Sequence, residues 1–573
     1  MLKQFFQKQF PIKNALFLFL FLSSFCTGLF SEAFCAVTSL VLTVLLCVEI
    51  FKSGKIHYSK SIEGLVLLLI AGGFLVTTLW ATDRLFALIG FLKFFALVLF
   101  AVLLCSKSEQ QREELLGFVP AAGVLMTVIS AVMTYAQIAP EFFSVNNRIA
   151  GFFQYPNSFA LFLLIGLIIC ALCGEFHPLK PVAMFILLGG IFLTGSRTCF
   201  VLLLASLIAI LIVSKDKKTK LSLAILLGAL LAAAAVYYFV SGKTDTLSRF
   251  FTISASSTTL KGRLIYAKDA AKEVLKHPFG LGYMGYYFTQ GSFQSALYAN
   301  MFVHNELLQM LLDIGWIPAI GFLFVIGRAL FNKDKPFHHK LIIAAILLHS
   351  LFDFNLQFLI IDFIFIICLS DSTKVQSFTP KRGVQWAIAA LLSLLFLLTA
   401  YFSVTVALFT LGKSDKAARL CPAYTLAQTD LLSHEEDTQK QVEIADTILK
   451  TNQHISIAFG AKAREQYALG DVLKMIEYEK KAIACARYSN NDYNLYYYML
   501  LSATELYLKK EDTSSARSCI REITLFEKKL KEIEAATDPK AYELPEKPDF
   551  TIKPEYRQQY QQFKSLLAQN GQK

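Results

Sequence analysis

One histidine lies where a polar stretch of the chain meets an apolar one, and it has the chemistry of a base. His304 is followed by Asn305 and Glu306, and then by a run rich in leucine. An imidazole accepts a hydroxyl proton near neutral pH, because its unperturbed pKa is about 6.5. His304 is therefore the candidate catalytic base, with Asn305 as a supporting group. The alternative is a histidine that only caps a helix at a membrane boundary.

Three arginines accompany this histidine in the polar connections between apolar segments: Arg148, Arg197 and Arg263. A guanidinium group binds phosphate oxygens through two parallel hydrogen bonds, which suits a diphosphate. The three arginines together therefore indicate a binding site for such a group. The alternative for each is an arginine that only reaches lipid phosphate at the membrane surface.

A pair of polar residues, His349 and Asp353, interrupts the apolar stretch 340–370. Polar groups are costly in lipid unless they face a cavity or a turn. Residues four apart share one face of a helix, so the pair is expected to be hydrogen-bonded and to support the site, although it could simply tie two spans together.

Neither a metal nor a cofactor is expected from the sequence. The polar connections assigned below to the outer face contain no Asp-x-Asp and no clustered carboxylates that would hold a divalent ion. Most of the 11 cysteines lie in apolar segments, and no Cys-x-x-Cys pairs with a second one.

The composition is that of a protein with many membrane spans. The chain has 573 residues, of which 55% are hydrophobic and 17% charged. Its net charge of +12 could suggest nucleic acid, but residues 412–573 hold 24 basic and 24 acidic residues. The whole excess lies in residues 1–411, where basic loops between spans explain it, so no nucleic-acid partner is expected.

The predicted fold is all-α, with about thirteen transmembrane helices. Apolar runs long enough to cross about 30 Å of hydrocarbon occur near 14–30, 33–51, 62–80, 85–105, 115–138, 158–174, 179–195, 198–213, 221–241, 305–331, 340–353, 357–370 and 384–411. The first could be a secretory signal, but we interpret it as an uncleaved span because no clean small-x-small cleavage site follows it.

The charge of the loops predicts their orientation. With the N-terminus inside, the inner loops carry 19 Lys and Arg, whereas the short outer loops carry only Arg84, Arg148 and Arg197. This bias predicts that the loop 242–304 and the tail 412–573 lie on the outer face of the membrane. It also favours two spans within 340–370, because a single span would move three basic residues outside.

The tail 412–573 is predicted to be a soluble domain of paired helices. Tyr467-Ala468-Leu469-Gly470-Asp471, and a related pattern around Tyr507, resemble tetratricopeptide (TPR) helix pairs, although their spacing of 40 residues exceeds the usual 34 or so. An irregular helical bundle is the alternative. Prolines then mark an extended connector before a last helix near 555–569.

Taken in order, these motifs resemble the O-antigen ligase superfamily, which includes O-antigen ligases, polysaccharide polymerases and protein O-oligosaccharyltransferases. The resemblance rests on Arg148 with Gly151, Pro156 and Asn157; Ser196-Arg197; Gly262-Arg263 with Tyr266; His277-Pro278 with Gly280 and Gly282; His304-Asn305 with Leu308, Gln309 and Gly315; and His349 with Asp353. Residues 1–140 match only as membrane spans.

The resemblance implies a metal-independent transfer of a glycan from an undecaprenyl-diphosphate-type donor to a hydroxyl acceptor. His304 would then be the base, and Arg197, Arg263 and Arg148 would bind the donor diphosphate. The large tail leaves the acceptor open between lipid A core, a polysaccharide and a protein. Three alternatives remain: a repeat-unit polymerase, a transporter of lipid-linked sugars, and a membrane-anchored scaffold for the helical tail.

Overall fold

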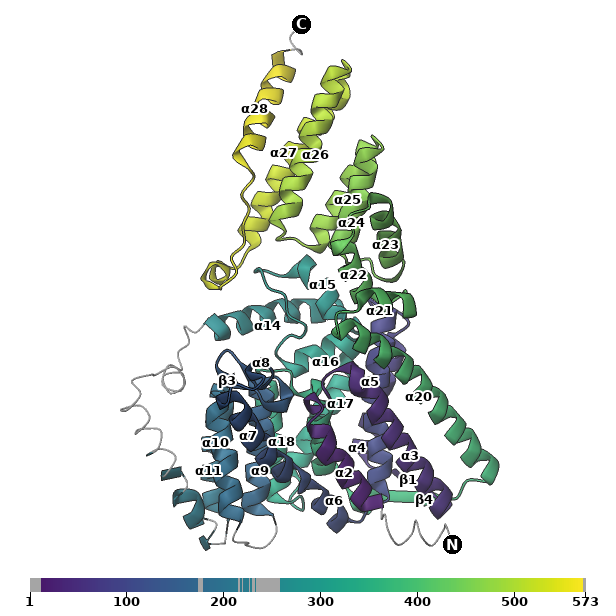
Figure 1. Ribbon diagram of the computed structural model, residues 1–573, viewed down its shortest axis with the longest axis vertical. Coiled ribbons are helices and arrows are strands. Elements are labelled where there is room, and N and C mark those ends of the chain that lie inside the picture. Colours follow the sequence, from purple (N-terminus) through teal and green to yellow (C-terminus); the bar gives the residue numbers. More distant parts are fainter. Residues whose placement is uncertain are drawn as a thin grey trace. The chain divides into compact units, whose positions relative to one another are not determined.

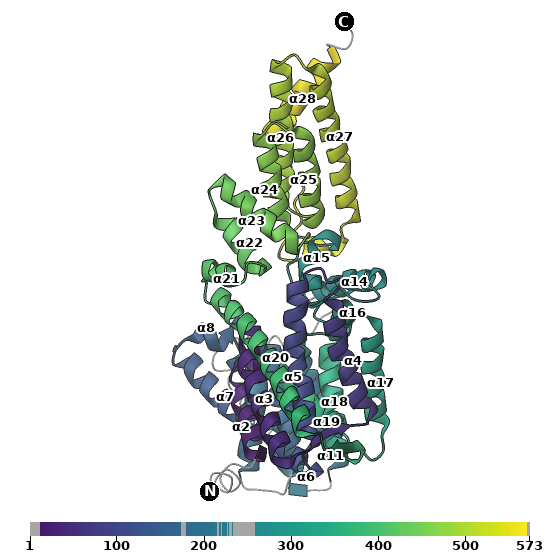
Figure 2. The same cartoon turned by 90° about the vertical axis from the view of Figure 1, so that its right-hand side faces the viewer.

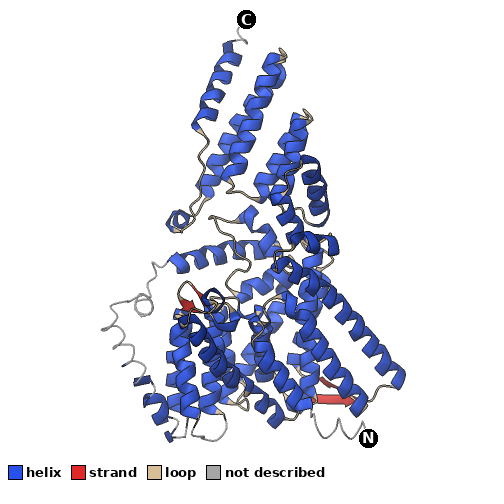
Figure 3. Ribbon diagram, viewed as in Figure 1, coloured by secondary structure: helices blue, strands red, loops and turns tan. Residues whose placement is uncertain are grey.

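The computed structural model describes residues 12–173, 179–214 and 258–569, together with parts of 217–232. These residues form helices with two small two-stranded ribbons (Figure 3). The chain divides into two compact units. We call Met1–Val76, Leu88–Ala255 and His304–Val404 the membrane unit, and Thr77–Ala87, Ser256–Val303 and Thr405–Lys573 the loop–tail unit.

The first half of the membrane unit is built around one helix that is buried on nearly all sides. The helices are α2 (Ile12–Ser24), α3 (Cys35–Ser53), α4 (Ile62–Thr77), α5 (Arg84–Cys105), α6 (Glu109–Leu116), α7 (Phe118–Tyr135), α8 (Pro140–Phe143), α9 (Pro156–Leu172), α10 (Lys180–Thr194) and α11 (Arg197–Val213). The central helix, α9, is apolar on every face, which is the pattern of a buried helix. It packs against α7, α10, α11 and a later helix, α18 (Figure 1).

The second half of the membrane unit contains α16 (Glu306–Ile314), α17 (Trp316–Phe331), α18 (Phe337–Ser350), α19 (Leu359–Leu369) and α20 (Arg382–Thr410). The expected single span 305–331 is wrong, because the helix breaks at Gly315, whose φ of 83° ends α16. The expected division of 340–370 agrees with α18 and α19, which a short 3₁₀ turn at Asn355–Gln357 separates.

Four candidate spans meet the length and hydropathy expected of a membrane crossing: Glu32–Ser53, Arg84–Cys105, Glu109–Tyr135 and Arg382–Thr410. Eight shorter apolar helices accompany them among the residues that the structure describes. Most of the expected span 221–241 lies outside the described residues. The chain is thus a multi-pass helical membrane protein, and the count of thirteen stays a prediction.

One ribbon joins two loops that the charge bias assigns to the same side. Strand β1 (Ile56–Ser59) pairs antiparallel with β4 (Val375–Phe378), and the amide of Lys60 donates to the carbonyl of Lys374. The basic loops around these strands therefore lie at one end of the membrane unit. That placement agrees with an even number of crossings between them. The second ribbon, β2 (Ser144–Val145) with β3 (Arg148–Ile149), contains Arg148.

The loop–tail unit combines two connections with the C-terminal helices. Its helices are α14 (Thr258–Lys276), α15 (Gly285–Phe293), α21 (Ser414–Leu420), α22 (Thr425–His434), α23 (Thr438–Thr451), α24 (Ser456–Ala468), α25 (Val472–Cys485), α26 (Asn490–Lys509), α27 (Thr513–Ala536) and α28 (Pro554–Gln569). Helix α26 packs against α27 and α28 (Figure 2). Tyr493, Tyr496 and Tyr497 of α26 are fully buried in this core. The last helix coincides with the one expected near 555–569, and the TPR assignment stays a prediction.

The tail is attached to the connections by specific hydrogen bonds. Asp83 accepts from the backbone amides at the start of α5 and also from Thr425 (2.5 Å) and Asn452 (3.2 Å) of the tail. The amide of Arg487 donates to the carbonyl of Gly291. A Cβ at Gly291 would collide with a carbonyl oxygen of α25, so this approach needs glycine.

Candidate functional site

His304 is held at the start of α16 by the residue that follows it. Asn305 caps the helix, because its Oδ1 accepts from the amide of Leu308 at 3.0 Å, and its Nδ2 donates to the carbonyl of Leu351 at 3.0 Å. His304 itself has φ of 59°, a left-handed conformation that is uncommon among residues other than glycine. The predicted supporting role of Asn305 is therefore to fix the backbone that presents the imidazole.

The imidazole of His304 faces a carboxylate that also accepts hydrogen bonds from other groups. Nδ1 lies 3.3 Å from Oδ1 of Asp353, whose side chain is only 1% exposed. Asp353 also accepts from Tyr155 Oη (2.7 Å), Asn157 Nδ2 (2.8 Å) and the amide of Phe354 (3.1 Å). These donors stabilise the ionised carboxylate, which in turn favours a proton on Nδ1 of His304 and gives Nε2 the role of proton acceptor.

Arg148 bridges two helix ends of the membrane unit. Its Nε donates to the carbonyl of Thr194 at the end of α10, and its Nη2 donates to Asn157 Oδ1 at the start of α9, both at 2.7 Å. Through Asn157 it is connected to Asp353 and so to His304. These bonds give Arg148 a positioning role beside its predicted contact with the donor.

Arg197 is the first residue of α11, whose start lies beside the start of α9. Ser196 caps α11 through the amide of Cys199 (3.5 Å), and the Cys199 thiol contacts the carbonyl of Asn157 at 3.7 Å. Helix N-termini favour anions, because unpaired amides and the helix dipole point there. Arg197 thus adds a guanidinium to a place where the backbone already favours negative charge.

Arg263 and His349, two of the predicted site residues, are placed differently from the residues around His304. Arg263 lies on α14 of the loop–tail unit, so its role in donor binding stays a prediction. His349 is fully buried near the end of α18, and that helix ends at Ser350. The expectation that His349 and Asp353 share a helical face is therefore wrong, because Asp353 lies in the turn beyond the helix, where it contacts His304.

Sequence reasoning missed Lys93, a fully buried lysine in the middle of α5. Its Nζ donates to the carbonyl of Phe30 at 2.7 Å and pairs with Glu32 at 3.2 Å. A single charge inside an otherwise apolar run was the available signal, since such residues in membrane helices are costly and are commonly functional.

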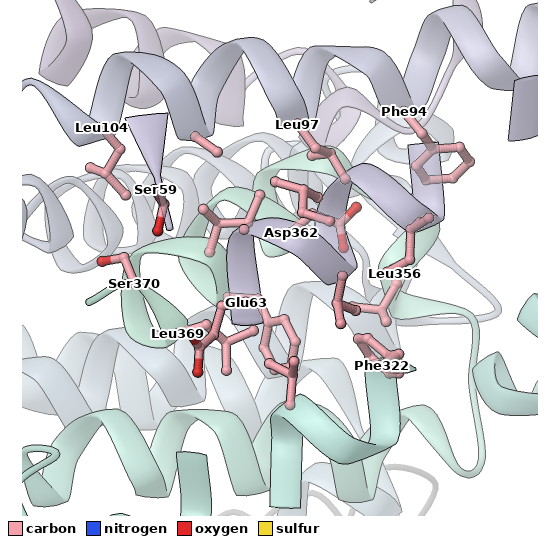
Figure 4. Close-up of a pocket in the computed structure, with 18 of the residues that line it drawn as sticks. Ser59, Glu63, Phe94, Leu97, Leu104, Phe322, Leu356, Asp362, Leu369 and Ser370 are labelled. Atoms are coloured by element: carbon pink, nitrogen blue, oxygen red, sulfur yellow. The ribbon is translucent and has the colours of Figure 1, made fainter. Parts of the chain in front are cut away.

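A cavity of about 140 Å³ also escaped sequence reasoning. Glu306, Asp313 and Asp362 line it together with Glu63, Arg112, Asp371 and many apolar side chains. Figure 4 shows Asp362 and Glu63 among the lining residues. Among the described residues, Oδ2 of Asp362 has no hydrogen-bond partner. Because α16 breaks at Gly315, Asp313 lies in a short helix rather than in a span. The cavity reaches Glu306, two residues after His304.

One group of described residues has the composition of a metal-ligand set. Glu113 of α6 lies 2.9 Å from His338 and 2.8 Å from His339, and both histidines belong to the start of α18. Two imidazoles and a carboxylate are typical zinc ligands, but the same distances suit hydrogen-bonded ion pairs. His304 lies beyond the opposite end of α18, so this group is separate from the candidate base.

The fold and the site define a multi-pass helical membrane protein that holds a histidine against a buried carboxylate, close to Arg148 and to the helix N-termini of α9 and α11. Residues 182–323 match the family model described as O-antigen ligase, which confirms the resemblance to the O-antigen ligase superfamily. The matched region contains Arg197, Arg263, His304 and Asn305 but neither Arg148 nor Asp353. No curated protein matches the chain. The match supports a membrane enzyme of the glycosyltransferase type.

Proposed function

We propose that the protein transfers a glycan from an undecaprenyl-diphosphate-type lipid to a hydroxyl acceptor at the periplasmic face of the inner membrane. The observation that carries this function is the contact of His304 Nδ1 with Asp353, whose other hydrogen bonds come from Tyr155, Asn157 and a backbone amide. A carboxylate held in this way supports a base without taking the proton itself.

The chemistry follows from that geometry. The acceptor hydroxyl attacks the anomeric carbon, and its proton passes to Nε2 of His304. The bond between the anomeric carbon and the diphosphate oxygen breaks, and the lipid diphosphate leaves with both electrons. The leaving group gains negative charge, which Arg197 and the N-termini of α9 and α11 stabilise. Arg263 would contribute a second guanidinium from α14.

Sidedness is supported by the loop charges and by the ribbon. The β1–β4 pairing joins two basic loops at one end of the membrane unit, and His304 lies toward the other end of α18. Basic loops face the cytoplasm, so the site would face the periplasm. An alkaline phosphatase fusion near residue 415 should be active, whereas a fusion near residue 56 should be inactive; the reverse pattern would contradict this orientation.

A reconstituted reaction tests the transfer itself. The purified full-length protein is mixed with a lipid-diphosphate-linked glycan and separate hydroxyl acceptors: lipid A core, a lipid-linked polysaccharide and a Ser/Thr peptide. We expect release of lipid diphosphate together with one glycosylated product. A polysaccharide product would identify a polymerase within the same chemistry, and movement of intact donor across vesicles without any product would favour a transporter.

A further inference from the structure

Glu113, His338 and His339 form a compact group at the end of α18 that lies opposite His304. The two carboxylate oxygens of Glu113 each face one imidazole, at 2.9 Å from Nε2 of His338 and 2.8 Å from Nε2 of His339. One possible ligand atom from each residue lies within 4.8 Å of the other two. Two ligand atoms of a tetrahedral zinc ion are about 3.3 Å apart, because each bond is about 2.0 Å long. Small side-chain rotations would therefore place all three atoms around one ion.

A thiol supplies a fourth possible ligand beside this group. Cys173 directly follows the last turn of α9, and its side chain lies within hydrogen-bonding reach of His338. It is a free cysteine and is partly exposed. Two imidazoles, a carboxylate and a thiolate are all typical zinc ligands, and together they fill the four positions of a structural site. The four residues come from α6, the end of α9 and the start of α18, three segments that are far apart in the sequence.

The charges of this group suit a bound cation. One carboxylate neutralises one protonated imidazole but not two, and Lys335 adds a further positive charge nearby. Despite its short contact with Glu113, Nε2 of His339 is buried and makes no hydrogen bond to any described residue. Two neutral imidazoles would leave Zn²⁺ neutralised by the carboxylate of Glu113 and the thiolate of Cys173. Such an ion lies between its ligand atoms, in place of protons, so this site needs no open cavity.

We propose that Glu113, His338, His339 and Cys173 bind a structural zinc ion. Four protein ligands leave no open position for water or substrate, so the ion stabilises the fold and takes no part in a reaction. It joins α6 and the end of α9 to the start of α18, and α18 also packs directly against α9. The ion therefore anchors one end of the helix whose other end leads to Asp353. Zinc binding at this place is independent of the proposed glycan transfer.

The metal content of the protein tests the site. Full-length protein purified in detergent without a histidine tag, incubated with Zn²⁺ and then desalted, should retain about one zinc ion per chain by atomic emission. Replacing His338 and His339 together by Ala should weaken zinc binding by more than about 100-fold, because changes outside the ligand shell already cost about 10–100-fold. His57→Ala, which removes a partly buried histidine of β1, is the matched control and should keep the ion. Wild-type protein that retains no zinc, or a double variant that retains it, would overturn the proposal.

Cobalt identifies the ligands in the wild-type protein, even if the double variant does not fold. Bound Co²⁺ should give the intense visible bands of a tetrahedral ion together with a near-ultraviolet band from a thiolate ligand, and added Zn²⁺ should remove both. Cys173→Ser should abolish the thiolate band, whereas Cys47→Ser on α3 should keep it. A wild-type spectrum with only the weak bands of six-coordinate cobalt would show adventitious surface binding and overturn the proposal. A thiolate band that persists in Cys173→Ser would also contradict the ligand set.

Discussion

Among its described residues, the membrane unit has a carboxylate in contact with histidine toward each end of α18, and the two carboxylates, Asp353 and Glu113, differ in what surrounds them. His304 and His338 are similarly exposed, at 19% and 17% of the side chain. Asp353 is buried and takes three further hydrogen bonds, from Tyr155, Asn157 and a backbone amide. Glu113 is more exposed and is shared between His338 and His339. Exposure of the histidine alone therefore does not distinguish a base from a structural ion pair.

The difference lies in what the carboxylate can do for the imidazole. Asp353 is held from several sides, so it can orient His304 while other groups stabilise its charge. Glu113 instead connects α6 with the start of α18. Helix α18 has 14 residues, so this contact lies about 20 Å along the helix from the candidate site at its other end. We expect the first contact to determine rate and the second to determine stability.

The sharpest test of this comparison is to remove each histidine in turn. His304→Ala should lower the transfer rate by about 10²–10⁴-fold, the usual effect of losing a general base. His338→Ala should leave the rate of purified, folded protein within a few-fold of wild type. Both are measured as lipid diphosphate released per unit of protein that remains monodisperse in detergent.

The two variants control each other, because each removes one imidazole of similar exposure from the same unit. Near wild-type transfer in His304→Ala would show that another group takes the proton. An equally large loss in folded His338→Ala would mean that position relative to α18 does not separate the two roles.

Replacing Asp353 by Asn should have the next largest effect. The amide keeps the size of the carboxylate but removes its charge, so His304 loses the partner that holds its proton on Nδ1. We expect the rate to fall by about 10²-fold with little change in acceptor KM. If Asp353 only supported folding, melting temperature would fall and the folded fraction would keep its full rate. The matched change Glu113→Gln should show that structural pattern.

How far the sequence predicts this site depends on the kind of contact. His304 and the arginines were recognisable because their chemistry contrasts with apolar neighbours. The partner of His304 was not, because Asp353 is 49 residues away and reaches it only after α18 ends and the chain turns. Lys93 was hidden for a related reason: hydropathy averages over a span and conceals one buried charge. The break at Gly315 was missed because hydropathy alone predicts one continuous helix over residues 305–331.

A smaller effect is expected from the arginines. Arg197→Lys and Arg263→Lys should each raise the KM for donor by about tenfold, since a point charge does not replace two parallel hydrogen bonds to a diphosphate. Arg148→Lys should act differently, because its bonds to Thr194 and Asn157 place the helix ends. We expect it to lower the melting temperature as well. Normal donor KM in both Arg197→Lys and Arg263→Lys would assign these side chains to lipid headgroups.

The smallest expected effect is that of a chelator. The candidate site pairs one histidine with one aspartate, and arginines would supply the positive charge that stabilises the leaving group. EDTA should therefore leave the transfer rate unchanged. A metal bound by Glu113, His338 and His339 would not alter this result for catalysis, because these residues lie at the other end of α18; its removal would lower the melting temperature only. Transfer lost in EDTA and restored by Mg²⁺ or Zn²⁺ would contradict the prediction. Glu113→Gln would then locate the ion: transfer that still depends on the metal in this variant places the ion away from Glu113, whereas transfer that no longer responds to the metal places it at Glu113 in the wild type.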